Sequence, residues 1–277
     1  MNLPPDFSVV PTSPPTFGFV PGETPPPAGS ASEQPRWGIP DIILGIVFII
    51  VAVVVATGIG LAIGGLDTMD DLVNGDLSGT DAIIFLGLTT FGQGGAMGLW
   101  PVIVARWKGR GVTHDFGWRF QPIDIAYGLG IGGLMLFLAA IVRFVVSPLV
   151  GLDPGADEST NTQIISDSAD GPAFVIILIA AVFLAPIVEE LFFRGLCLRA
   201  IEKRFGTTAG VLGSTLLFTL PHFTNPSLAG TTVLFAAIGT VGLVLAVLTV
   251  KTGRLGAAVI AHAVFNGIGV VATLAAT

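Results

Sequence analysis

Apolar segments of about 20 residues recur along this chain and constrain its fold more than any other feature. A helix needs about 20 residues to cross the ~30 Å hydrocarbon core of a bilayer, because it rises ~1.5 Å per residue. Of the 277 residues, 52% are hydrophobic and 11% are charged, whereas soluble domains carry about 25% charged residues. The chain is therefore predicted to be an all-α, polytopic transmembrane helical bundle in a lipid bilayer.

The predicted spans form one membrane domain over residues 39–277. About seven spans are expected, with eight helices as the upper count; they lie at residues 40–64, 81–106, 123–150, 172–203, 207–224, 230–250 and 254–275. Residues 1–38 are rich in Pro, Ser, Thr and Gly and show no periodicity. Such a segment cannot bury enough apolar area to offset its chain entropy, so it is predicted to be a disordered tail.

Acidic and basic residues alternate between successive connections, and this alternation predicts the orientation of the spans. The connections after the first and third spans carry only acidic side chains, whereas those after the second, fourth and sixth spans carry Lys and Arg. The tail and the basic connections are therefore predicted to be cytoplasmic. We expect an integral protein of a bacterial cell membrane, because no eukaryotic targeting signal stands out. A net charge of -7 argues against a nucleic-acid partner.

Ionisable residues inside a span are costly and therefore mark candidate functional sites. The fourth span contains the segment APIVEELFFRG, with Glu189, Glu190 and Arg194. The i,i+4 spacing predicts a pair between Glu190 and Arg194, whereas Glu189 points ~100° away around the helix. Two interpretations stay open. Either the pair is structural and Glu189 bonds to a neighbour, or the pair orients the helix and leaves Glu189 as a working base.

Two of the three His residues also lie inside predicted spans. His222 follows Phe218 by four residues, and Asn266 follows His262 by four residues, so each pair shares a helix face. Counting ~1.5 Å per residue from the predicted turns places Glu189, both His and Asn266 at similar depths. We therefore expect one polar cavity, lined by the fourth, fifth and seventh spans and open toward the cytoplasmic half.

Such a set of groups suits hydrolysis by an activated water. A carboxylate in an apolar site is a better base, and an imidazole can orient a water. A second imidazole and an amide can donate hydrogen bonds to an oxyanion. Cys197 is about two helical turns from Glu189 and has no paired base, so it is not a credible nucleophile. The predicted reaction is the hydrolysis of a peptide bond.

Three other residues in the spans receive structural predictions. Pro186 has no N–H and is expected to disturb the helix at the carbonyl of Val182. Gln93 lies among glycines and is expected at a tight helix contact, with lining of the cavity as the alternative. Arg143 lies about seven residues from the end of the third span, within reach of the interface, and is expected to anchor there.

The motifs EExxxR, FxxxH and HxxxN resemble those of the CPBP family of intramembrane proteases, which groups CAAX prenyl endopeptidases with bacteriocin-processing and abortive-infection-type immunity proteins. The resemblance covers about residues 172–270, and no motif position departs from the pattern. It implies a catalytic set and a supporting set: Glu189 and His222 to activate water, His262 and Asn266 to form the oxyanion hole, and Glu190, Arg194 and Phe218 to support them.

No metal or other cofactor is expected, because the candidate ligands come from three separate helices without HExxH spacing. Zinc bound by Glu189, His222 and His262 is the alternative. The expected substrate is a membrane-embedded or lipid-anchored peptide. Two rival functions stay open: a non-catalytic immunity or scaffold protein of the same fold, and a proton-coupled transporter with Glu189 and His222 as a relay.

Overall fold

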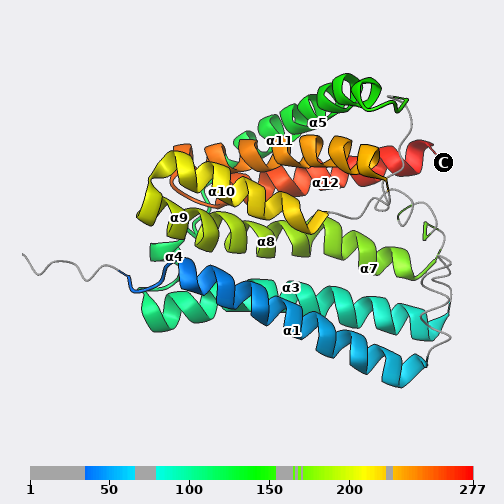
Figure 1. The fold of residues 1–277 in the computed structure, drawn as a ribbon, viewed down its shortest axis with the longest axis horizontal. Helices are drawn as coiled ribbons and strands as arrows, with labels where there is room; N and C mark the ends of the chain where they lie inside the picture. Colours follow the sequence, from blue (N-terminus) through cyan, green and yellow to red (C-terminus); the bar gives the residue numbers. More distant parts are fainter. Residues whose placement is uncertain are drawn as a thin grey trace, which may run out of the picture. The chain divides into compact units, whose positions relative to one another are not determined.

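The computed structural model describes residues 35–65, 79–153, 165, 168–169, 171–222 and 227–276. Most of the predicted disordered tail, residues 1–34, lies outside the described residues. Within the described ranges all regular secondary structure is helical (Figure 1), so the predicted all-α class is confirmed.

Six helices in the described part of the chain are long and apolar enough to cross a bilayer. They are α1 (Ile39–Gly64), α3 (Thr80–Lys108), α5 (Ile123–Leu149), a composite helix over Ala173–Phe205, α11 (Leu228–Thr252) and α12 (Gly256–Ala276). A short helix, α4 (Val112–Asp115), lies between α3 and α5. The predicted polytopic helical bundle is confirmed, and six of the seven predicted spans correspond to these helices.

The predicted span at 207–224 is the exception. Its helix, α10 (Thr207–Thr219), has 13 residues, which gives a length of about 20 Å, short of the ~30 Å hydrocarbon core. One turn of 3₁₀ helix, η3 (Leu220–His222), follows it. Pro221 explains the change of helix type, since it has no N–H to continue an α-helix. His222 therefore stands at the end of a helix instead of inside a span.

The composite helix switches twice from the α-helical to the π-helical hydrogen-bond register. Its parts are α7 (Ala173–Ile179), the π-helix η1 (Ala180–Leu184), α8 (Ala185–Glu189), the π-helix η2 (Glu190–Cys197) and α9 (Leu198–Phe205). In a π-helix each N–H bonds five residues back, which widens the helix and leaves main-chain groups to be satisfied by other partners. Such turns are frequent at functional sites. Glu189 and Glu190 lie at the junction between α8 and the second π-helix.

The basic connections lie at one end of the bundle, called the basic end below (Figure 1). The N–H of Arg36 bonds to the carbonyl of Lys108, 2.7 Å away, and the N–H of Leu255 bonds to the carbonyl of Gly117, 2.8 Å away. The first bond joins the segment before α1 to the end of α3, and the second joins the connection between α3 and α5 to the turn between α11 and α12. The opposite end, with Asp153, is called the acidic end. That the basic end faces the cytoplasm stays a prediction.

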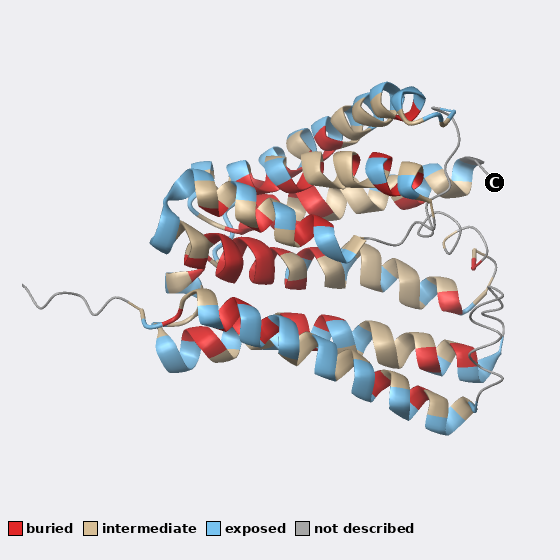
Figure 2. Cartoon of the chain, viewed as in Figure 1, coloured by how far each residue is buried: buried red, intermediate tan, exposed pale blue. Residues whose placement is uncertain are grey.

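Buried side chains concentrate around η2 and α9 (Figure 2). All eight residues of η2 are buried, and their core extends to Phe116 and Trp37. Trp37 falls within the predicted disordered tail, yet its ring lies 5.3 Å from that of Phe116. The ammonium of Lys203 donates to the carbonyl of Trp37, 3.1 Å away. Residues 35–38 are therefore packed against the bundle, because an aromatic side chain there can join the core.

Candidate active site

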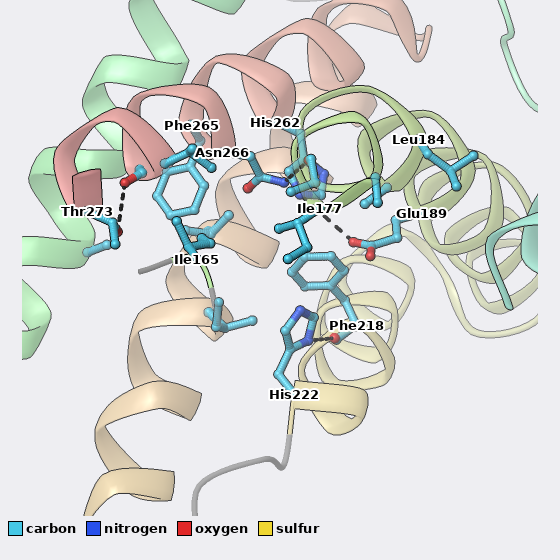
Figure 3. Close-up of a pocket in the computed structure, with 18 of the residues that line it drawn as sticks. Ile165, Ile177, Leu184, Glu189, Phe218, His222, His262, Phe265, Asn266 and Thr273 are labelled. Carbon is cyan, nitrogen blue, oxygen red and sulfur yellow. Dashed lines mark hydrogen bonds and ion pairs between the residues drawn. The ribbon is translucent and has the colours of Figure 1, made fainter. Parts of the chain in front are cut away.

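One cavity of about 990 Å³ brings the four predicted catalytic residues together (Figure 3). Glu189 reaches it from α8, His222 from η3, and His262 and Asn266 from α12. The predicted lining by the fourth, fifth and seventh spans is therefore found, and residues of α3, α5 and α11 line the cavity as well.

Glu190 and Arg194 form a fully buried ion pair, as their spacing predicts. The Nη1 atom of Arg194 lies 3.0 Å from Oε1 of Glu190, and both side chains have an exposed fraction of 0%. The Nη2 atom of Arg194 donates to the carbonyl of Gly242 at 3.0 Å. Its guanidinium carbon lies 4.2 Å from the ring centroid of Phe218. Removing two charges from water is costly, and these additional partners of the guanidinium offset part of that cost.

Glu189 differs from its neighbour in burial and in partners. Its side chain is 20% exposed and lines the cavity. Its Oε2 atom lies 3.9 Å from Nε2 of His262, which is too long for a hydrogen bond. Of the two adjacent carboxylates, the buried one has two close partners and the other faces the cavity.

His262 is held by Glu190, and sequence reasoning missed this contact. The Nδ1 atom of His262 lies 2.9 Å from Oε1 of Glu190, the oxygen that also accepts from Arg194. The imidazole also packs edge-on against Phe218, with ring centroids 5.8 Å apart. Glu190 and His262 are 72 positions apart, and no local spacing could have signalled their contact. Glu190 therefore orients an imidazole as well as a guanidinium.

His222 is held by a carbonyl that Pro221 leaves without its donor. In a 3₁₀ turn each N–H bonds three residues back, so the carbonyl of Phe218 would pair with residue 221, which has no N–H. The Nδ1 atom of His222 takes that place, 2.9 Å from the Phe218 carbonyl. The two rings also pack, with centroids 5.2 Å apart. With Nδ1 engaged as a donor, Nε2 of His222 is the acceptor nitrogen.

The Asn266 amide is likewise held by a carbonyl, that of Ala181, which Pro186 leaves without a main-chain donor. The N–H of Ala185 bonds to the carbonyl of Ala180, five residues back. In that register Pro186 would be the donor to the carbonyl of Ala181, and it has none. The Nδ2 atom of Asn266 donates to this carbonyl at 2.7 Å. The disturbance predicted at Val182 thus falls one residue earlier, because the π-helix shifts the pairing by one.

The cavity extends from the four residues toward the acidic end, opposite to the predicted opening. Its lining residues on α3 lie between Thr90 and Met97, around the middle of the helix. On α12 they run from His262 to Thr273, toward the acidic end. The buried core around η2 fills the basic end, and this packing is the physical reason for the difference. Gln93 and Arg143 also line the cavity, which is the alternative position predicted for Gln93.

No group of three or more His, Cys, Asp or Glu side chains suited to hold a metal ion occurs among the described residues. Glu189, His222 and His262 all line the cavity, but Nδ1 of each imidazole is already engaged. Metal independence stays a prediction that an experiment must test.

Comparison with known proteins gives one match. Residues 171–268 match the family model described as Type II CAAX prenyl endopeptidase Rce1-like. The matched range begins just before α7 and contains the four predicted catalytic residues, whereas α1, α3 and α5 lie outside it. No curated protein and no solved structure matches the chain. Residues 171–268 are therefore similar to the type II CAAX prenyl endopeptidase Rce1-like family, and the resemblance to CPBP proteases predicted from three motifs is confirmed over this part of the chain.

Proposed function

We propose that this protein is an intramembrane endopeptidase that cleaves membrane-embedded or lipid-anchored peptides with an activated water. The family match supports a CAAX-type membrane protease at the level of the family. The observation that carries the proposal is the contrast between two adjacent carboxylates. Glu190 is buried and bonded to Arg194 and His262, whereas Glu189 faces a cavity that His222, His262 and Asn266 also line.

Glu189 and His222 activate the water in this proposal. A water between them donates one hydrogen to the Glu189 carboxylate and the other to Nε2 of His222. Two hydrogen bonds of ~2.8 Å require acceptor atoms roughly 4–6 Å apart. A lone pair of the water oxygen then points toward the carbonyl carbon of the substrate. Such acid–base assistance contributes about 10²–10⁴-fold to a rate.

His262 and Asn266 stabilise the oxyanion. The Nδ2 group of Asn266 has two hydrogens, and only one is needed for the Ala181 carbonyl. His262 uses Nδ1 toward Glu190, so Nε2 donates only when both ring nitrogens carry hydrogen. Two carboxylates, Glu189 and Glu190, would then balance the charges of Arg194 and an imidazolium at His262. Glu190 therefore acts through His262 as a positioning residue.

The bond changes balance with water as the single co-substrate. The water oxygen bonds to the carbonyl carbon while Glu189 takes a proton, and the charge that develops on the carbonyl oxygen is held by His262 and Asn266. The C–N bond then breaks, and Glu189 passes its proton to the leaving nitrogen. The products are a new carboxyl terminus and a new amine.

The proposed reaction proceeds without a metal, and a chelator separates it from the zinc alternative. Activity of the purified protein should persist after dialysis against chelator, because the water contacts only Glu189 and His222. Stoichiometric zinc in active protein, together with activity lost in chelator and restored by zinc, would contradict this prediction.

The function itself is tested with the purified full-length chain in lipid nanodiscs. We expect cleavage of members of a library of membrane peptides, detected by product masses, and no cleavage by the Glu189→Gln variant. Folded wild-type protein that cleaves no peptide would favour a scaffold or immunity role instead. With the basic end in the bacterial cytoplasm, as the charge alternation predicts, substrates would enter from the outer half of the bilayer.

A further inference from the structure

The cavity continues beyond the four proposed catalytic residues, and a cationic side chain lines its far part. Arg143 lines it from α5, together with Ile165 and with Thr273 of α12. No other Lys or Arg of the described residues lines this cavity. The walls between the two ends carry many small residues, including Ala139, Ala140, Ala181, Gly269 and Ala272, which leave room for an occupant.

Arg143 belongs to the cavity face of α5 and not to its outer face. Four residues of α5 line the cavity, and their spacing i, i+3, i+4, i+7 is that of one helix face: Leu136, Ala139, Ala140 and Arg143. The large apolar residues exposed on this stretch occupy the other face: Leu134, Phe137, Ile141 and Phe144. The Arg143 side chain therefore projects from the helix face that lines the cavity. The low dielectric there strengthens the attraction between its guanidinium and an anion.

Helix register gives the distance between this cation and the reacting groups. A Cβ atom on Gly132 would lie 2.7 Å from a methyl carbon of Val264, so α5 packs on α12 at this level. Eleven residues further along both helices, Arg143 stands near the level of residue 275, thirteen residues after His262. At ~1.5 Å per residue the separation along the bundle is about 20 Å. An extended peptide spans that distance with about six residues at 3.3–3.6 Å each.

We propose that Arg143 binds a carboxylate of the substrate, placed about six residues or fewer from the scissile bond. This assignment rests on the proposed protease function. A guanidinium matches a carboxylate in a bidentate geometry, and hydrogen bonds between charged groups are the strong ones. Glu189 at the other end repels the same carboxylate, so the two charges together orient a bound peptide. The carboxylate comes from the peptide C-terminus or from an acidic side chain.

Binding without turnover tests the assignment, using the Glu189→Gln protein in nanodiscs and fluorescent hexapeptides of Leu and Ala. Three probes are compared: the free acid, the C-terminal amide, and the amide with Asp as its last residue. We expect the free acid to bind about 10- to 100-fold more tightly than the amide, as a charged hydrogen bond implies. Adding Arg143→Gln should bring both to the affinity of the amide, and Arg143→Lys should retain part of the preference. Arg204→Gln, at the basic end, is the matched control and should change nothing.

The third probe separates the two sources of the carboxylate. Recovery of tight binding by the Asp-containing amide indicates recognition of an acidic side chain, and no recovery indicates the C-terminus. Equal binding of acid and amide, or a preference that survives Arg143→Gln, would overturn the assignment. Absence of cleavage by wild-type protein would contradict the proposed function and leave this binding difference unaffected, so the two failures are distinguishable.

Discussion

The two halves of the helical bundle differ in how they treat polar groups, and the boundary runs between two adjacent residues. Toward the basic end, η2 is completely buried and Glu190 bonds to Arg194 and His262. Toward the acidic end, the helices enclose a cavity, and Glu189 faces it. A charge in the first half is fixed by its partners, whereas a charge in the second half remains accessible to water and substrate. Two identical side chains, Glu189 and Glu190, thus differ in burial and in partners because of the packing around them.

Helix type contributes to this difference. Pro186 and Pro221 each leave a carbonyl without its main-chain donor, and Asn266 and His222 occupy the two carbonyls. A side chain held by a strong acceptor loses less conformational entropy when substrate binds. The half of the bundle toward the acidic end therefore combines an open cavity with two side chains, Asn266 and His222, that are already oriented.

The largest expected effect concerns Glu189, the carboxylate that faces the cavity. Glu189→Ala should reduce cleavage by about 10²–10⁴-fold, because the general base is lost. The free energy of unfolding should change by no more than about 0.5 kcal/mol, because Glu189 is partly exposed and has no hydrogen bond within its helix. Peptide cleavage and thermal melts in detergent measure both quantities. Wild-type cleavage by a folded variant would remove Glu189 from the mechanism.

The second prediction concerns Glu190, the neighbouring carboxylate, which is buried against Arg194. Glu190→Ala should lower the free energy of unfolding by about 3–5 kcal/mol, because it leaves the buried charge of Arg194 without its carboxylate. Unfolding in mixed detergents measures the change. The double variant with Arg194→Leu should be less destabilised than the single variant, since the buried guanidinium charge is then removed as well. A Glu190→Ala melting curve identical to wild type would show that the pair does not stabilise the fold.

A smaller effect is expected where a side chain crosses from α12 to the composite helix. Asn266→Ala should destabilise the protein by about 1–3 kcal/mol, because the Ala181 carbonyl loses its donor. Cleavage should also fall, by about 10²–10³-fold, if the amide contributes to the oxyanion hole. Thr240→Val is the control, since the Thr240 hydroxyl bonds one turn back, to Ala236, and Thr240 is not among the residues that line the cavity. Loss of stability with unchanged cleavage would assign Asn266 a purely structural role.

The smallest effect compares two adjacent glycines of α3. A Cβ atom on Gly94 would lie 2.8 Å from Cδ2 of Leu184, whereas one on Gly95 would meet nothing within 4 Å. Gly94→Ala should therefore destabilise the protein by about 1 kcal/mol, at the low end of overpacking costs, because the atom that it meets is a terminal methyl of Leu184, which can shift. Gly95→Ala should stabilise it by up to about 1 kcal/mol, because Ala is the better helix former. Equal melting temperatures for both variants would show that α3 can move away from the composite helix.

Periodicity along single helices determined much of this protein in advance. The lengths of the apolar runs predict six helices that the structure describes as long enough to cross a bilayer, and the i,i+4 spacing predicts the pair of Glu190 and Arg194. The error at 207–224 has a local cause, because Pro221 ends the α-helix early. The four residues of the proposed mechanism were predictable because polar groups in a predicted span are costly and therefore mark candidate functional sites.

Tertiary structure alone decided which neighbour each helix face meets. A spacing of 3.6 residues per turn gives the angle of a side chain on its own helix, but it carries no information about the helix on the other side. The contact between Glu190 and His262, 72 positions apart, depends on how α12 packs against the composite helix. The extension of the cavity toward the acidic end depends on where the apolar core fills the bundle. The cavity-facing position of Arg143 likewise depends on α5 packing against α11 and α12, since both of its faces read as apolar in the sequence.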